Sequence, residues 1–198
     1  LDAGTGTTSV GVIGSGTEIG TLSIGSDENG GITLNGAITT DGVVTLDGPI
    51  TLATAAITIT TADDNINLQG TVDGAKALTL ASGSGAVTVD GAIGSSTALT
   101  SLTVNSSGTG TIEITNIGTA SASGVTGTTA IGNTNTGTLT LDGTVYTTNA
   151  ATYTAATGEN IDLTGGATTT FTSSNDDITF GTATVEMANG SNLKIDTD

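Results

Sequence analysis

The sequence predicts an all-β fold, a parallel β-helix (β-solenoid) with coils of about 21–24 residues, a period typical of coils that bury their inner faces by stacking. Two observations predict it. Short apolar bursts alternate with Thr, and the same bursts return at nearly constant steps, as from Ile57 to Leu78 and from Leu78 to Leu102. Thr, Val and Ile also favour strands. A β-sandwich is the alternative, because it has short strands at regular spacing, but it does not require such constant steps.

The bursts alternate with a period of two, as in "ITIT" (57–60), "VTV" (87–89) and "LTL" (139–141). In a strand this alternation puts the aliphatic side chains on one face and Thr on the other. Each burst is therefore predicted to be a short strand with one buried face.

Consecutive bursts also come in pairs at an offset of nine or ten positions. The pairs are Ile57/Ile59 with Ile66/Leu68, Leu78/Leu80 with Val87/Val89, Leu102/Val104 with Ile112/Ile114, and Leu22/Ile24 with Ile32/Leu34; "FTSSNDDITF" (171–180) repeats the pattern with aromatic residues. We expect each pair to form two successive walls of one coil.

Residues 57–77 serve as a model coil with three walls. Its predicted inward residues are Ile57, Ile59, Ile66, Leu68 and Val72, which should stack on Leu78, Leu80, Val87, Val89 and Ile93 of the next coil. At the inter-strand spacing of about 4.8 Å, the length suits about nine coils and a rod of very roughly 40 Å.

The phrase "AVTVDGAI" (86–93) has near copies at 31–38, 43–50, 65–72 and 138–145. Asp-Gly or Asn-Gly between β-prone runs is a strong hairpin signal. Only two or three strand residues follow the glycine of each copy before another break, however, so a returning strand would not cover the previous one. The phrase is better interpreted as one corner of a coil, with Gly91 permitting the bend.

Composition excludes several partners and activities. The 198 residues carry 19 acidic side chains against two lysines, a formal net charge of -17, which repels nucleic acid and anionic lipid. No apolar run has the roughly 18 residues of a membrane helix, so we expect no membrane insertion. With no His, Cys or Arg, the chain lacks the usual acid–base partners, and we expect neither an enzyme nor an organic cofactor.

The stretch "GTVDGAKALTLASGSGAVTVDGAIGSSTALTSLTVNSSG" (70–108) resembles the β-strand repeats of large secreted bacterial surface proteins, the filamentous-haemagglutinin-like adhesins. The resemblance implies a right-handed β-helix in an extracellular or cell-surface fibre. It covers roughly the central half of the chain. The secretion domain and adhesive tip of that family have no counterpart in these residues.

Calcium is the one metal that the sequence suggests. Asp47, Asp90 and Asp142 precede Gly at matched corners, and "ADDN" with Asp63 and Asp64 resembles "NDDI" with Asp176 and Asp177. Carboxylates stacked a few ångströms apart would repel, and a hard cation with oxygen ligands would relieve that repulsion. The alternative, which turn chemistry favours, is that these residues form turns by bonding their own backbone.

The sequence therefore predicts a single β-solenoid array over 1–198, either part of a longer chain or a subunit that stacks end to end. Its expected partners are neighbouring coils or identical subunits, and its expected role is a rigid extracellular stalk or filament unit. The alternative is a binding module that grips calcium, a host or environmental glycan, or ice along one wall. Ice is disfavoured because Asn67 and Glu113 interrupt the Thr pairs.

Overall fold

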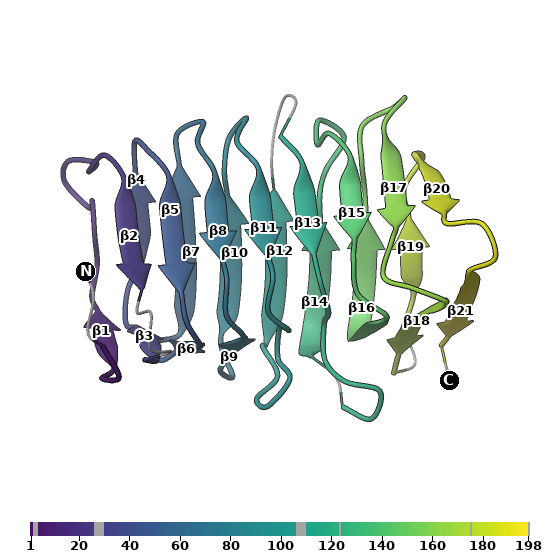
Figure 1. Ribbon diagram of the computed structural model, residues 1–198, viewed down its shortest axis with the longest axis horizontal. Helices are drawn as coiled ribbons and strands as arrows, with labels where there is room; N and C mark the ends of the chain where they lie inside the picture. The colour runs from purple at the N-terminus through teal and green to yellow at the C-terminus, as the bar shows by residue number, and fades with distance from the viewer. Residues whose placement is uncertain (2–3, 26–29, 106–109, 123, 175, 198) are drawn as a thin grey trace.

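The computed structural model describes residues 1, 4–25, 30–105, 110–122, 124–174 and 176–197. Within these residues it contains 21 strands and no helix. Every pairing between named strands is parallel, and the strands stack into a flattened β-solenoid of about seven coils (Figure 1). The predicted all-β solenoid is confirmed and the sandwich is excluded, since its sheets would be antiparallel.

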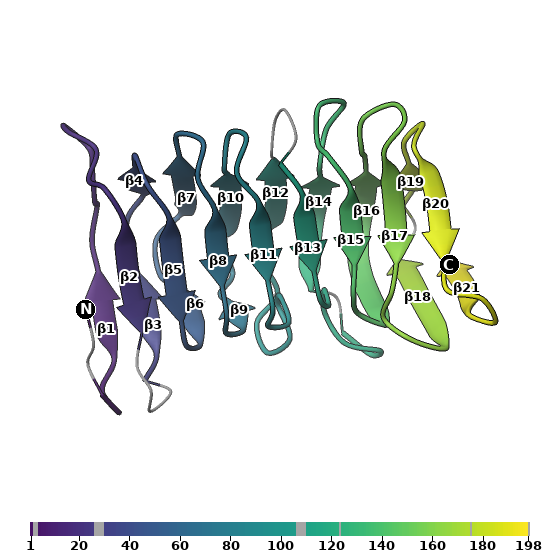
Figure 2. The same ribbon diagram turned by 45° about the horizontal axis from the view of Figure 1, so that its top comes forward.

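Three walls run along the stack, and each coil passes through all three (Figure 2). The first wall begins with β1 (Thr8–Val10), β3 (Ile32–Leu34), β6 (Ile50–Leu52) and β9 (Val72–Asp73). The second wall contains β4 (Ile38–Thr40), β7 (Ala56–Thr61), β10 (Ala77–Ala81), β12 (Ser101–Asn105) and β14 (Val125–Ile131). The third wall contains β2 (Leu22–Gly25), β5 (Val44–Asp47), β8 (Ile66–Leu68), β11 (Val87–Val89), β13 (Ile112–Ile114), β15 (Leu139–Leu141), β17 (Asn160–Leu163) and β20 (Thr184–Met187).

The strand β16 (Val145–Tyr153) joins the first wall to the second without a loop. Its first half pairs with β18 (Thr168–Ser173) and its second half with β19 (Ile178–Phe180), while β21 (Asn192–Asp196) pairs with β18. Between β9 and β16 the first wall is reduced to single bridges at Ile93 and Ile117. These bridges connect β9 to β16, so the first wall continues along the whole stack.

The model coil of the sequence analysis is confirmed at every inward position. The register pairs are Ile57 with Leu78, Ile59 with Leu80, Ile66 with Val87, Leu68 with Val89, and Val72 with Ile93. All ten side chains are buried. The core is thus a set of aliphatic columns parallel to the stacking axis.

Two details of the sequence prediction are wrong. The register step varies, being short from Ile32 to Ile50 and long from Ile112 to Leu139, because corner insertions lengthen some coils while the columns stay aligned. The third wall has eight strands, so the described residues make seven to eight coils and not nine. The pair at 22–24 and 32–34 also occupies different walls from the other pairs. Leu22 and Ile24 lie on the third wall, so Ile32 and Leu34 lie on the first wall of the next coil.

Aromatic side chains replace aliphatic ones in the last coils. Tyr146 and Phe171 continue the column of Ile117, and Tyr153 and Phe180 continue that of Ile131. The four rings contact one another with centroids 4.9 to 6.3 Å apart. In the neighbouring column the small residues Thr129 and Ala151 follow Leu102, so large rings stand beside small side chains and the interior remains filled.

The two tyrosine hydroxyls have different environments. The Tyr146 hydroxyl accepts a hydrogen bond from the Gly143 amide at 2.8 Å and donates to the carbonyl oxygens of Ile114 and Thr115 at 2.9 Å. The Tyr153 hydroxyl is buried and has no hydrogen-bond partner among the described residues. Burial raises the pKa of both phenols well above the ordinary value, so both stay protonated at neutral pH.

Phenylalanine substitutions should separate these two hydroxyls. Tyr146→Phe leaves the Gly143 amide and the Thr115 carbonyl without the hydroxyl that binds them, while the Ile114 carbonyl keeps its bond from the Asp142 amide. The variant should lower the free energy of unfolding by about 1–3 kcal/mol. Tyr153→Phe removes a buried polar group that forms no bond, so stability should stay equal or rise by about 1 kcal/mol. Urea unfolding of both variants measures the difference; equal losses would contradict the assignment.

Gly91 has a different role from the one predicted. A Cβ on Gly91 would lie 2.2 Å from the carbonyl carbon and oxygen of Gly70 in the previous coil, and a Cβ on Gly70 would meet Gly48 in the same way. Glycine is required because backbones of successive corners touch, and not because the bend needs a left-handed residue.

Gly91→Ala should therefore force two coils apart and cost about 1–3 kcal/mol of unfolding free energy. Gly11→Ala is the matched control, since nothing lies within 4 Å of its Cβ position, and it should change stability by less than about 0.5 kcal/mol. Thermal unfolding of both variants tests this. Equal effects would show that contact between corners is not the reason for glycine at this position.

Candidate functional site

The corner aspartates of the third wall do not stack directly on one another. The register places Gln69 between Asp47 and Asp90, and Thr115 between Asp90 and Asp142. Matched carboxylates are therefore two coils apart, about 10 Å at the strand spacing. The close repulsion that suggested calcium at these corners is absent, because an uncharged residue separates each pair.

The two Asp-Asp turns lie at different places in the coil. Asp63 and Asp64 lie between the second and third walls, whereas Asp176 and Asp177 lie between β18 and β19, where the chain passes from the first wall to the second. They share only a local bond, in which Thr61 donates to the Asp64 carbonyl and Ser173 to that of Asp176. The predicted equivalence of the two turns is wrong in position and right in local chemistry.

Several polar side chains at the corners bind the backbone of the next coil. The Asp63 carboxylate accepts bonds of 3.0 Å from the amide and hydroxyl of Ser84, and these bonds lower its pKa. Asn65 accepts from the Ala86 amide, Asp73 from the Ser96 and Thr97 amides, and Asn116 from the Thr144 and Val145 amides, all at 2.8 to 3.0 Å. These residues join successive coils, whereas for the "ADDN" turn that contains Asp63 the sequence suggested bonds within the turn itself.

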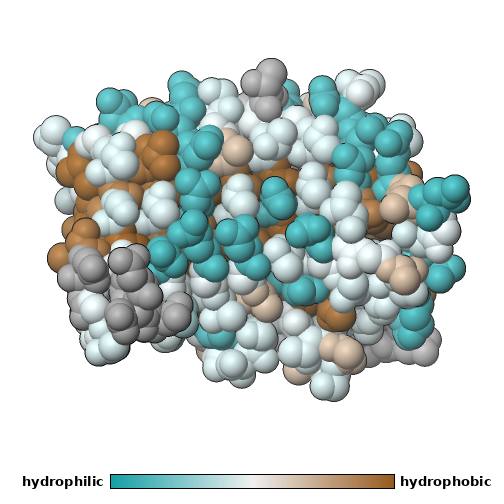
Figure 3. Space-filling view, viewed as in Figure 1, coloured by the Kyte–Doolittle hydropathy of each residue, from teal (hydrophilic) through white to brown (hydrophobic). Residues whose placement is uncertain are grey.

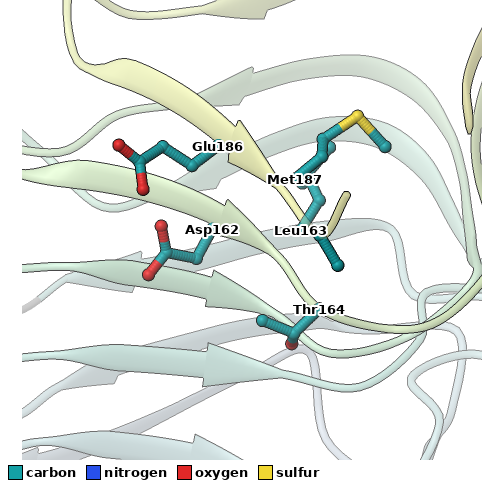
Figure 4. Close-up of a pocket in the computed structure, with 6 residues that line it drawn as sticks. Asp162, Leu163, Thr164, Glu186 and Met187 are labelled. Atoms are coloured by element: carbon teal, nitrogen blue, oxygen red, sulfur yellow. The ribbon is translucent and has the colours of Figure 1, made fainter. Parts of the chain in front are cut away.

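The structure brings together two carboxylates that the sequence analysis missed. Asp162 on β17 and Glu186 on β20 are register partners on the outer face of the third wall. Figure 4 shows both carboxylates on the same side of a hollow of about 250 Å³, away from Leu163 and Met187. Oδ1 of Asp162 is shielded from solvent and has no hydrogen-bond partner in the described chain. The signal was present, since "NIDL" and "TVEM" each place a carboxylate between two inward residues.

Among the residues that the structure describes, no three His, Cys, Asp or Glu side chains gather as a metal site. Asp162 and Glu186 form a pair, and the calcium prediction remains a prediction.

The outer walls carry few large apolar side chains. Figure 3 shows mostly hydrophilic and weakly polar residues over the central coils of the third wall, with hydrophobic atoms visible between them and more of them toward the left end. Large exposed apolar side chains in the described residues lie at the two ends of the stack: Leu1, Val12, Ile19, Leu193 and Ile195. The ends therefore differ chemically from the sides.

No protein-family model, no curated protein and no solved structure matches this chain. Within the described ranges, the structure has no helix long and apolar enough to cross a membrane. The resemblance to adhesin repeats thus remains an expectation from the sequence.

Neutralising Glu186 should stabilise the fold. Like charges on neighbouring strands destabilise a sheet by about 0.2–1 kcal/mol, so Glu186→Gln should raise the melting temperature at low salt, with less effect in about 1 M NaCl. Glu113→Gln is the matched control, because its register neighbours are Thr88 and Thr140.

The same variants test calcium. If the pair holds calcium, the ion should raise the melting temperature of the wild type and of Glu113→Gln but not of Glu186→Gln. A lower melting temperature for Glu186→Gln in calcium-free buffer would contradict the repulsion.

Proposed function

We propose that this chain is a structural protein, a rigid β-solenoid that acts as an extracellular stalk or filament unit. The observation that carries the proposal is the pair of inward columns on the third wall, which keep one register without interruption from β2 to β20. A stack held in this way is elongated and stiff, and a structural role of this kind needs no reactive site.

The bonds between coils support the same role. Asp63, Asn65, Asp73 and Asn116 each reach into the following coil, so the corners as well as the walls are tied along the axis. Bonds of this kind resist the separation of coils, which is the failure that a load-carrying rod must avoid.

The apolar end surfaces support stacking on further coils. Leu193 and Ile195 on β21 lie at one end, and Val12 and Ile19 lie at the other. Unpaired strand edges with apolar inward positions are templates for another strand. The neighbouring coils belong either to the same polypeptide or to an identical subunit.

The proposed location rests on the resemblance to adhesin repeats and on the composition. A chain without cysteine has no thiol to cross-link or oxidise outside the cell. The rod then stands outside a bacterial cell or on its surface. Antibody labelling of intact cells that make the full-length protein tests this, and labelling only after permeabilisation would contradict it.

Removing one coil tests the rod itself. Deletion of residues 66–86 joins Asn65 to Val87 and preserves every column, because Val87 is the register partner of Ile66 in the next coil. The shortened protein should unfold cooperatively near the wild-type temperature and be shorter by about 4.8 Å in small-angle scattering. Deletion of residues 66–76 removes about half a coil and should prevent folding. Loss of folding in the whole-coil deletion would contradict the proposal that the rod is built from interchangeable coils.

A further inference from the structure

The corner between the first and second walls varies in length along the stack. In the early coils three residues connect the walls, as at 35–37, 53–55 and 74–76. The connection lengthens after Ile93 and again between Ile117 and Val125, where Thr119 and Ala122 bridge each other in a protruding loop (Figure 1, lower edge). In solenoids, insertions into individual coils gather on one face, and that face is often the binding face.

β16 crosses this corner with no loop, between two coils that have one. The loop that contains Ala120 lies before it, and the turn that contains Asp176 and Asp177 lies after it. A hollow lies on each side of the corner, and β16 lines both. One, of about 310 Å³, includes Val145 and Thr147; the other, of about 300 Å³, includes Ala150 and Thr152. The two hollows are separate in the structure and share β16 as a lining strand, and we call them together the β16 groove.

The walls of the β16 groove carry hydroxyl groups that bind nothing in the protein. Thr170 and Thr172 line the first half, and Thr128, Thr152 and Thr179 line the second. Their side chains make no hydrogen bond within the described part of the chain. Thr147 differs, because its hydroxyl donates to the Thr119 carbonyl at 2.9 Å and fixes the loop against the floor.

One end of the groove adds a paired donor and acceptor. The Lys194 ammonium lies 3.1 Å from the Asp196 carboxylate, and the lysine side chain is 61% exposed. Ala130 and Ala150 lie in the second half and leave it shallow and free of bulky side chains. The groove therefore offers a donor and an acceptor that can exchange their mutual contact for hydrogen bonds to a ligand, next to a floor of alanine methyl groups.

These properties select the class of ligand. A formal charge of -17, with Asp177 and Asp196 lining the groove, disfavours nucleic acids and acidic glycans. None of the large exposed apolar side chains lines either hollow, so a lipid or an apolar peptide finds no anchor. A neutral chain of hydroxyl groups matches the free threonines, since each hydroxyl both donates and accepts.

We propose that the β16 groove binds a neutral oligosaccharide that lies along β16 from Val145 to Thr152. The inference goes beyond the rod: scattering and coil deletion test the rod, whereas the experiment below tests only the groove.

The experiment begins with the 198-residue protein on an array of neutral and acidic oligosaccharides, and continues with calorimetry on the strongest neutral ligand. Thr170→Val with Thr172→Val removes the hydroxyls of the first half, and Thr128→Val with Thr152→Val removes those of the second. Each double variant should bind at least about tenfold more weakly, which corresponds to the loss of roughly one hydrogen bond. Thr58→Val with Thr79→Val is the matched control, because these threonines are register partners on the outer face of the second wall, three and two strands before β14, and line neither hollow.

Valine keeps the strand preference of threonine, and circular dichroism melts check that all variants fold. Neutral glycan binding that both groove variants weaken and the control leaves intact supports the proposal. Binding of acidic glycans alone, of basic peptides alone or of no ligand overturns it. Loss of binding in only one groove variant overturns the continuous groove.

Discussion

The parallel backbone ladder between coils is the constraint on which the structure depends. Each strand pairs with the strand one coil earlier and one coil later. A buried residue can therefore be replaced only by one whose side chain fits between its register partners in the two neighbouring coils. Buried aliphatic residues therefore repeat along the axis, whereas outward positions vary freely between Thr, Asn, Asp and Glu. The same constraint explains the stacked corner glycines, since the ladder fixes the separation of successive backbones.

Residue columns that obey this rule were the predictable part of the fold. The apolar pairs at 57–68 and 78–89 have equal spacing, so stacking one on the other requires no knowledge of the corners. Phase was less predictable, because the bursts at 22–24 and 32–34 look like any other pair, and only the register with β5 and β6 shows which walls they occupy. Coil number depended on corner insertions, which change length without changing the columns.

The candidate sites were harder to predict than the core for the same reason. Asp47, Asp90 and Asp142 share a phrase but not adjacent coils, so sequence similarity overstated their proximity. Asp162 and Glu186 share no phrase but are register partners. Hydrogen bonds such as that from the Ser84 amide to Asp63 join residues on successive coils, and a turn rule that considers only neighbours does not find them. The glycine of Asp-Gly also has a different role from the one in a hairpin turn, because it allows the backbone to contact the preceding coil.

The small rise of each coil has an electrostatic consequence. About seven coils at a spacing of about 4.8 Å carry a net charge of -17, which is roughly one charge for every 2 Å of axis. Duplex DNA carries one charge per about 1.7 Å and holds a condensed layer of counterions as a result. The rod therefore has the linear charge density of a strong polyelectrolyte. Such a rod attracts a layer of cations. Repulsion between the negative charges keeps parallel rods apart in dilute salt, and added salt screens this repulsion and lets the rods approach.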